Sequence, residues 1–247
     1  MIRLDQALVD RGLCESREKA KRAIMAGQAL VNGQPGRKPS DAVNPGDELA
    51  LAALERFVSR GGHKLEHALQ HFQLDVTELS AIDVGASTGG FTDCLLQAGA
   101  AKVFAVDVGH GQLAWKLRRD RRVVVMEKTN ARHVTPAQMP QPYSPADLAA
   151  IDCSFISLRK IVLPVVALLK PVAKIVALIK PQFEAGRAEA DKGAGVITDP
   201  AIHERVLSEL EQFVRAETGL KWIGVTESSL LGPAGNKEFL VLIEKQG

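Results

Sequence analysis

Hydrophobic side chains from residue 79 onward fall into short continuous runs, separated by segments with helical spacing. The runs predict strands at residues 81–84, 102–106, 123–127, 147–151, 173–179, 222–228 and 238–244. Strands that alternate with helices predict a parallel sheet with helices on both of its faces. The last two strands flank a Gly- and Pro-rich loop, and we expect them to form an antiparallel pair at one edge of the sheet.

Two segments near the C-terminus differ in character. Residues 200–217 place apolar side chains on one face at helical spacing, which predicts a long helix packed on the core. Residues 183–199 are rich in Gly, Ala and charge. We expect this second segment to be a mobile loop beside a ligand site.

The first 58 residues show a different pattern and predict a separate small α+β domain. Two short amphipathic helices are expected at residues 3–11 and 17–25, with Ser16 as the N-cap of the second helix. A strand and tight Asn-Gly turn at residues 31–34, a Pro-Gly turn and a strand at residues 48–51 follow. We therefore expect two domains, residues 1–58 and 59–247, with a short joint at the end of the first.

Composition and charge narrow the class of protein only a little. The net charge is +2, so any case for nucleic-acid binding must come from local clusters. Cys14, Cys94 and Cys153 are far apart, which is typical of reduced thiols. Because we find no charged leader and no apolar run of membrane-spanning length, we expect a cytoplasmic protein that is not embedded in a membrane.

A glycine-rich turn follows the first strand of the predicted sheet. Residues 83–90 have the form D-x-G-x-x-x-G-G, with Ser87 where a dinucleotide-binding turn carries its second glycine. The stretch resembles the first motif of S-adenosyl-L-methionine (SAM) methyltransferases. That resemblance implies a SAM site, although a glycine turn without a ligand is the alternative that this stretch alone leaves open.

Polar residues follow several predicted strands, at the edge of the sheet where ligands bind in open α/β folds. An acid after the second strand, Asp107, commonly holds a ribose hydroxyl pair, and Asn130 is placed to contact an adenine. The expected SAM-binding residues are Asp83, Gly85, Ala86, Ser87, Thr88, Gly89, Gly90, Phe91, Asp107, Val108, Asn130 and Asp152. His63, His67 and His71 share one helix face, but no further ligand type lies nearby, so we expect a polar face and no metal site.

A basic cluster lies on the second predicted helix and in the loop after the Asn-Gly turn. The order of elements around it, R-L-D-x-A-L, then S-R-x-x-A-x-x-x-I-x-x-G, an Asn-Gly turn and P-G-D, resembles the S4 RNA-binding domain. The resemblance implies contacts with RNA phosphates, although a solvated helix face is the simpler explanation of the charges alone. The expected RNA-binding residues are Arg3, Arg17, Lys19, Lys21, Arg22, Arg37, Lys38 and Arg60.

Five further motifs, S-R-G-G-H-K-L, D-V-G-H-G-Q-L, S-F-I-S-L, K-P-Q-F-E and G-N-K-E-F, make the whole chain similar to the TlyA family. That family joins an S4 domain to an FtsJ-like, Rossmann-like SAM methyltransferase domain. It implies 2′-O-ribose methylation of cytidine in large-subunit ribosomal RNA, in some members also of small-subunit RNA. The family's catalytic Lys-Asp-Lys-Glu tetrad falls on Lys64, Asp152, Lys180 and Glu238. One departure is Phe57 in the joint, where members usually have Trp or Tyr.

These residue types suggest a mechanism as a hypothesis. A ribose 2′-hydroxyl must lose its proton as it attacks the methyl group of SAM, and we expect Lys180 to be the base. Lys64 would favour the neutral amine of Lys180 by charge repulsion. Asp152 would orient Lys180 and the sulfonium, and Glu238 would hold the hydroxyl or Lys64.

Four other functions compete with this interpretation. A membrane-active hemolysin needs an inserting segment, and an S4-type pseudouridine synthase needs a mostly β catalytic domain. An RNA-binding protein with a vestigial Rossmann-like domain would be expected to lose parts of the tetrad. A nicotinamide dehydrogenase is disfavoured by Ser87. The sequence leaves open the modified nucleotide, the form of the ribosomal substrate and the oligomeric state.

Overall fold

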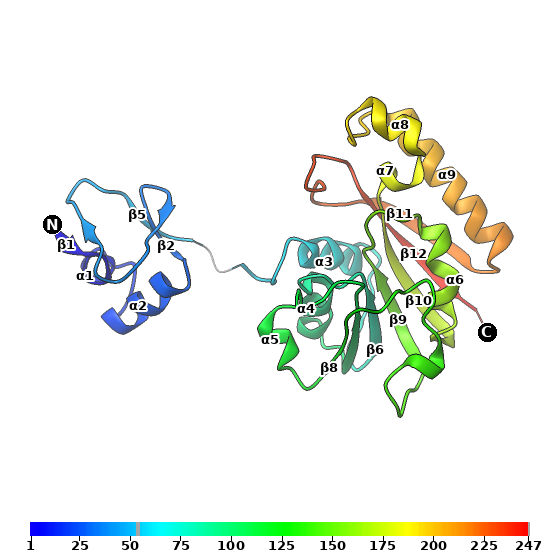
Figure 1. Cartoon of the computed structure of the whole chain (residues 1–247), viewed down its shortest axis with the longest axis horizontal. Helices are drawn as coiled ribbons and strands as arrows, with labels where there is room; N and C mark the ends of the chain where they lie inside the picture. The colour runs from blue at the N-terminus through cyan, green and yellow to red at the C-terminus, as the bar shows by residue number, and fades with distance from the viewer. Residues whose placement is uncertain (53–54, 247) are drawn as a thin grey trace. The chain divides into compact units, whose positions relative to one another are not determined.

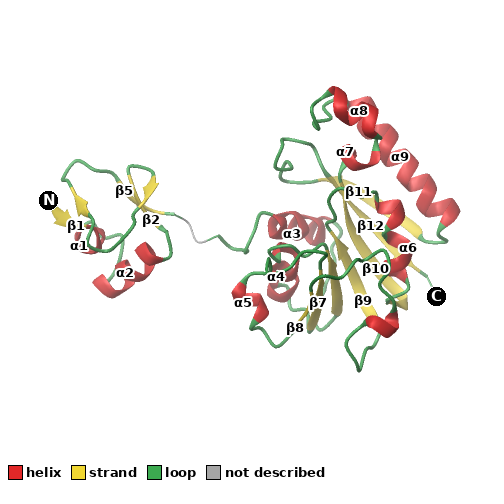
Figure 2. Cartoon of the chain, viewed as in Figure 1, coloured by secondary structure: helices red, strands yellow, loops and turns green. Residues whose placement is uncertain are grey.

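The computed structural model describes residues 1–52 and 55–246. The chain divides into two compact units, Met1–Arg56 and Phe57–Gly247. The boundary expected from the sequence, after residue 58, lies two residues beyond this division after Arg56. Residues 53, 54 and 247 of the two expected domains fall outside the described part. Figures 1 and 2 show the elements of both units.

The N-terminal unit packs two helices against short strands. Helix α1 (Leu4–Asp10) begins one residue later than the sequence predicts and ends one residue earlier. Helix α2 (Arg17–Met25) has the predicted bounds, and Ser16 Oγ accepts a hydrogen bond from Lys19 N at its start. The strands are β1 (Ile2–Arg3), β2 (Ala29–Val31), β3 (Gln34–Pro35), β4 (Ala42–Val43) and β5 (Leu49–Leu51). Its small core consists of Leu4, Ala7, Leu8, Ala20, Ile24, Ala29 and Val43.

The C-terminal unit is built on a seven-stranded sheet with the order β11-β12-β10-β9-β6-β7-β8. The strands are β6 (Ser80–Val84), β7 (Lys102–Val106), β8 (Val123–Met126), β9 (Ala146–Ile151), β10 (Leu169–Ile179), β11 (Lys221–Glu227) and β12 (Phe239–Lys245). The five strands from β6 to β10 pair in parallel, and β12 pairs antiparallel with both β10 and β11. The α/β sheet with an antiparallel edge hairpin is thus confirmed.

Helices cover both faces of this sheet (Figure 1). Along β10, Ile175, Ala177 and Ile179 pack in one cluster with α6 and α9. The intervening Val176 and Leu178 pack in the other cluster with α3 and α4, which is the two-residue period of a strand buried on both sides. The α-helices are α3 (Gly61–His71), α4 (Gly90–Gln97), α5 (Trp115–Arg118), α6 (Val162–Val166), α7 (Pro181–Glu184), α8 (Arg187–Lys192) and α9 (Pro200–Glu217), with 3₁₀ turns η1 (Pro136–Gln138) and η2 (Leu158–Lys160).

The structure differs from the loop that the sequence predicts at residues 183–199. The segment continues α7 and then forms α8, which begins after Gly186 at φ 98° and ends before Gly193. The buried Asn236 holds the stretch that follows, because its Oδ1 accepts from Ile197 N at 2.9 Å and its Nδ2 donates to Gly195 O at 2.8 Å. The prediction of a loop is therefore wrong for α8, whereas residues 193–199 contain no helix or strand, as expected.

None of the helices among the described residues combines the length and apolar character that crossing a bilayer requires.

Candidate active site

The glycine turn between β6 and α4 has a backbone that only a few residue types adopt. Gly85 has φ 84°, Ser87 48° and Gly89 97°. A Cβ on Gly85 would lie 2.5 Å from the carbonyl oxygen of Asp152, so the turn also approaches the end of β9 too closely for a side chain. The turn therefore presses against the residue that follows the neighbouring strand.

Asp83 lies beneath this turn and is fully buried. Its Oδ2 accepts hydrogen bonds from Thr92 N at 2.8 Å and from Thr92 Oγ1 at 2.6 Å, which ties β6 to the first turn of α4. Its Oδ1 has no hydrogen-bond partner among the described residues. Burial, helped by the nearby charges of Asp152 and Asp107, raises the pKa of Asp83 to about 7, although the hydrogen bonds from Thr92 act in the opposite direction.

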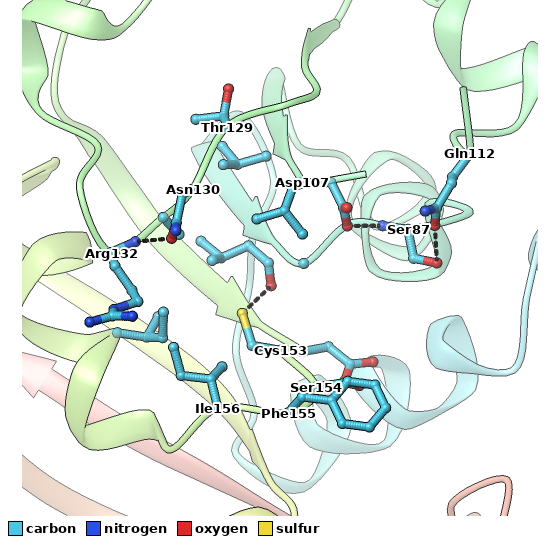
Figure 3. A pocket seen from close by; sticks show the side chains of 17 residues that line it. Ser87, Asp107, Gln112, Thr129, Asn130, Arg132, Cys153, Ser154, Phe155 and Ile156 are labelled. Carbon is cyan, nitrogen blue, oxygen red and sulfur yellow. Dashed lines mark hydrogen bonds between the residues drawn. The ribbon is translucent and has the colours of Figure 1, made fainter. Parts of the chain in front are cut away.

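A cavity of about 440 Å³ opens off the carboxyl ends of β6, β7 and β9 (Figure 3). Asp107, at the end of β7, organises one wall: its Oδ2 accepts from Ser87 N at 2.8 Å and its Oδ1 from Gly109 N at 2.6 Å. Asn130 and Val108 line the cavity as well. Cys153 also lines it and is a half-buried free thiol, whose pKa burial raises to about 12.

Glu127, which follows β8, fixes the loop beside this cavity. Its carboxylate accepts hydrogen bonds from the backbone of Gly111 at 2.9 Å and of Gln112 at 3.1 Å. It also pairs with Arg118, and the backbone bonds together with this guanidinium lower the pKa of Glu127 to about 2. Gln112, which lines the cavity, is thereby held within reach of Ser87 Oγ, at 3.2 Å.

A second cavity of about 450 Å³ adjoins the first, and both are lined by Ser87, Asp152 and Ser154. All four residues of the expected tetrad line this second cavity: Lys64 from α3, Asp152 after β9, Lys180 after β10 and Glu238 before β12. Lys64 comes close because α3 and α4 meet at glycines: a Cβ on Gly90 would lie 2.9 Å from Gly62 N. The fold thus gathers side chains that are far apart in the sequence.

The tetrad forms two ion pairs. Lys180 Nζ lies 2.5 Å from Asp152 Oδ1 and donates a hydrogen bond to Ser154 Oγ at 2.9 Å. Lys64 pairs with Glu238, and both side chains are buried. Since Glu238 offsets the charge of Lys64, the arrangement favours a role for Lys64 in holding Glu238 over simple repulsion of Lys180.

Two expected cofactor residues, Asp83 and Gly89, do not line either cavity. Asp83 is buried behind the turn, and Gly89 faces Leu113 and Leu117 on the other side. The remaining ten line one or both cavities, so most of the expected set lies around one continuous hollow: Gly85, Ala86, Ser87, Thr88, Gly90, Phe91, Asp107, Val108, Asn130 and Asp152.

The expected RNA-binding residues are split between the two units. Arg60 lies in the C-terminal unit, lines the tetrad cavity and donates to Leu231 O at 2.6 Å. In the N-terminal unit the buried Asp5 binds both Arg3 and Arg17 at 2.9 Å, and these guanidinium groups lower its pKa to about 2. The other five are exposed: Lys19, Lys21, Arg22, Arg37 and Lys38. Of these, Lys19 pairs with Glu15, and Arg22 lies 3.9 Å from Glu18.

Phe155 is a candidate that the sequence reasoning did not single out. It is 89% exposed, has φ 63° and lies at the rim of the first cavity, with its ring 5.0 Å from that of Phe183 (Figure 3). Glu184 secures its loop, because Oε2 accepts from Ser157 Oγ at 2.6 Å and Oε1 from Leu158 N at 2.7 Å. An aromatic residue between two serines after a strand was the available signal.

The residues present fit a SAM molecule. The glycine cradle and an acid at the end of β7, both of which line the adjoining cavities, are what a nucleoside with a charged amino-acid tail requires. On the histidine face of α3, His67 Nε2 lies 3.4 Å from Thr226 Oγ1. Within residues 1–52 and 55–246, no three His, Cys, Asp or Glu side chains lie close enough together to hold a metal ion.

Comparisons with known proteins match both units. Residues 57–245 match the model of the FtsJ-like methyltransferase family, and residues 2–49 match the S4 domain. The chain is 49% identical to YqxC of Bacillus subtilis (99% of this chain, 86% of that protein) and 44% identical to the 16S/23S rRNA (cytidine-2′-O)-methyltransferase TlyA of Mycobacterium tuberculosis (99% and 90%). A solved structure from Streptococcus thermophilus, described as a hemolysin, is 44% identical in sequence to this chain and superposes with a TM-score of 0.75. The match covers 99% of this chain and 88% of that chain.

Proposed function

Because the chain belongs to the TlyA family of FtsJ-like methyltransferases with an S4 domain, we propose that it methylates ribosomal RNA at a cytidine 2′-oxygen with SAM as donor. The observation that carries the proposal is the pair of adjoining cavities that share Asp152, one beside the glycine turn and one containing both lysines. A methyl transfer needs two such adjoining sites, one for the donor and one for the acceptor.

The first cavity is proposed to hold the donor. Asp107 would take the ribose hydroxyls, Asn130 the adenine and the turn from Gly85 to Thr88 the methionine part. SAM supplies a methyl group on a positively charged sulfur, a strong electrophile. The chain's own contribution there is orientation and exclusion of water by the walls that Asp107 and Glu127 hold in place.

The tetrad cavity is proposed to hold the target ribose. Nζ of Lys180, as the neutral amine, would accept the proton of the 2′-hydroxyl, whose oxygen would take the methyl group that SAM supplies while the methyl–sulfur electron pair remained on the sulfur. Asp152 faces both cavities, so its single negative charge is shared between Lys180 and the cationic donor. The Lys180 side chain is only 10% exposed, so Asp152 and Ser154 hold its amine at the cavity wall with little contact with bulk water.

The Lys64–Glu238 pair is proposed to position the acceptor. Both side chains line the tetrad cavity and are fixed against each other, so either can hydrogen-bond the ribose without a rotamer search. Ser154 Oγ, which accepts from Lys180, fixes the direction of the amine. Each of the four groups therefore has a role in orientation, and Lys180 alone moves a proton.

The N-terminal unit is proposed to bind ribosomal RNA through its basic surface on α2 and the loop after β3. Exposed Lys21, Arg37 and Lys38 form no ion pair among the described residues, so their charges are free to meet phosphates. Asp5 holds Arg3 and Arg17 in fixed positions. Residues 1–56 contain no Phe, Trp or Tyr, which favours recognition of backbone and shape over base stacking in this unit.

The experiment that tests the proposal is a map of ribose methylation on both ribosomal RNAs. Ribosomes from cells that lack this protein and from cells that express it would be compared, and mass spectrometry of the digested RNA would identify the modified nucleoside. We expect 2′-O-methylcytidine to appear only with the protein. Identical maps, with well-folded protein present, would refute the proposal, and the position of the signal would identify the subunit.

A further inference from the structure

The segment Trp115–Arg122, α5 and the turn after it, contains an aromatic residue and five cations within eight positions. Trp115 is 71% exposed, and its indole makes no hydrogen bond or ring contact with any residue that the structure describes. Its flanking residues Leu113 and Leu117 are buried against Gly89. The two leucines therefore anchor the segment to the glycine turn and leave the indole in solvent.

Three of the five cations have structural partners. Lys116 Nζ lies 2.8 Å from Asp93 Oδ2, Arg118 pairs with Glu127, and Arg122 lies 2.8 Å from Asp120. The other two, Arg119 and Arg121, are exposed and form no ion pair with any described residue.

Arg119 shares a helical face with Trp115. Arg119 N bonds Trp115 O at 3.2 Å, so the two side chains are four positions apart on one turn of helix and lie on the same face. A solvated indole beside an uncommitted guanidinium combines a stacking surface with a phosphate contact.

The segment also adjoins the tetrad cavity. Ala114 N donates to Thr88 O at 3.1 Å, and Thr88 lines that cavity. Gln112, two residues earlier, lines the first cavity. RNA whose ribose enters the tetrad cavity would therefore have its neighbouring nucleotides within reach of α5.

We propose that the exposed face of Trp115, Arg119 and Arg121 is an RNA-contact surface of the C-terminal unit, which stacks one base on Trp115 and binds flanking phosphates with the two arginines. The inference rests on the proposed function, because it assumes an RNA acceptor in the tetrad cavity. It adds a contact that belongs to the catalytic unit itself. A single exposed apolar side chain needs no explanation on its own, and the two exposed cations that follow it within the same eight-residue segment are what point to RNA.

The chain offers a direct probe, since it has two tryptophans and the other, Trp222, is buried. Deproteinised bacterial 23S ribosomal RNA would be titrated into the full-length protein while indole emission is recorded, and methyl transfer to the same RNA and to large ribosomal subunits would be measured in parallel. We expect saturable quenching in the wild type. Trp115→Phe should lose the quenching and keep most of its affinity, because a phenyl ring still stacks.

The variants separate stacking from charge. Trp115→Ala should weaken RNA binding about 10-fold with an unchanged salt slope, whereas Arg119→Ala and Arg121→Ala should each reduce the slope of log K against log salt by about 0.7 to 0.9. Val172→Ala, at a site 75% exposed, and Lys221→Ala, on the edge strand opposite β8, are the matched controls and should behave as wild type. SAM affinity should be unchanged in all of them.

Unquenched emission with intact methylation would overturn this inference and leave the proposed function standing. Variants that weaken binding to subunits but not to deproteinised RNA would also overturn it, since the partner would then be a protein. Absence of RNA binding and methylation in the wild type, on subunits as well as on free RNA, would refute the proposed function and the inference together.

Discussion

Lys180 Nζ lies 2.5 Å from Asp152 Oδ1, although 28 positions separate the two residues in the chain. The parallel register explains the contact: Ile151, which precedes Asp152, pairs with Ala177 on β10, and Lys180 follows the end of that strand. The carboxyl ends of neighbouring parallel strands thus deliver an acid and an amine to one point. The same edge carries the glycine turn, so the reactive groups lie beside the donor cavity.

Removal of one partner of the Lys64–Glu238 pair should destabilise the protein strongly. Lys64→Met leaves a carboxylate that is 1% exposed without a counter-charge, and we expect a loss of about 3–5 kcal/mol in the free energy of unfolding. The double variant Lys64→Met with Glu238→Leu should lose clearly less than the sum of the single variants. Urea unfolding of the four proteins measures this cycle, and additive losses would show that the two side chains are not coupled.

Asp83 should make stability fall as the pH rises through the neutral range. Its folded pKa of about 7 is above the ordinary 3.8, so between these values the folded state binds more protons than the unfolded state. The stabilisation is complete below about pH 4 and is lost as the pH rises to 7. Between pH 5 and 8 the wild type should lose about 3 kcal/mol relative to Asp83→Asn, which cannot ionise. Parallel stability curves for the two proteins would contradict the assignment.

Phe155 should act on the RNA and leave SAM binding alone. Its ring is exposed at the rim of the first cavity, where a displaced base could stack, so Phe155→Ala should raise KM for RNA about 10-fold with an unchanged Kd for SAM. Glu184→Ala should change KM in the same direction, because it removes both oxygens that accept the bonds that hold the loop. Steady-state methylation and SAM calorimetry test both, with Leu163→Ala as the exposed apolar control. An effect on SAM alone would place Phe155 at the donor.

Binding of the N-terminal unit to RNA should depend steeply on salt. With about five phosphates neutralised, log K should fall with log salt at a slope of roughly −3 to −4. Lys21→Ala removes an exposed charge with no ion-pair partner in the described chain and should make the slope shallower by about 0.7. Lys174→Ala, an exposed cation on β10, is the control. If Lys21→Ala and Lys174→Ala gave equal slopes, α2 would not face the phosphates.

The regular elements could be predicted from the sequence because periodicity is a local property. The helices at residues 17–25 and 200–217 agree with the structure residue for residue. Helices α7 and α8 could not be predicted, because they are short. The stretch after α8 is held by the hydrogen bonds of Asn236 with Gly195 and Ile197, which depend on tertiary packing.

Most residues of the candidate site could be predicted from the sequence, but the contacts that they make with one another were harder to predict. Strand-end position and motif resemblance both pointed to Lys180 and Asp152, whereas the burial of Asp83 behind the turn depends on how α4 packs on β6. The motif resemblance left open whether Glu238 holds Lys64 or the substrate hydroxyl, and the ion pair with Lys64 depends on α3 and β12 lying side by side. Neither spacing nor composition carries that information, because the two residues are 174 positions apart.

Methyl transfer by Lys180→Ala tests the central claim most directly. The variant and the wild type would be saturated with methyl-labelled SAM, mixed with ribosomal subunits and followed through a single turnover, with SAM affinity measured by calorimetry on the same samples. The account predicts that Lys180→Ala binds SAM as the wild type does and transfers the label to cytidine 2′-oxygen at least about 100-fold more slowly. Transfer at the wild-type rate would contradict it, because the proton would then leave by a route that does not use this amine.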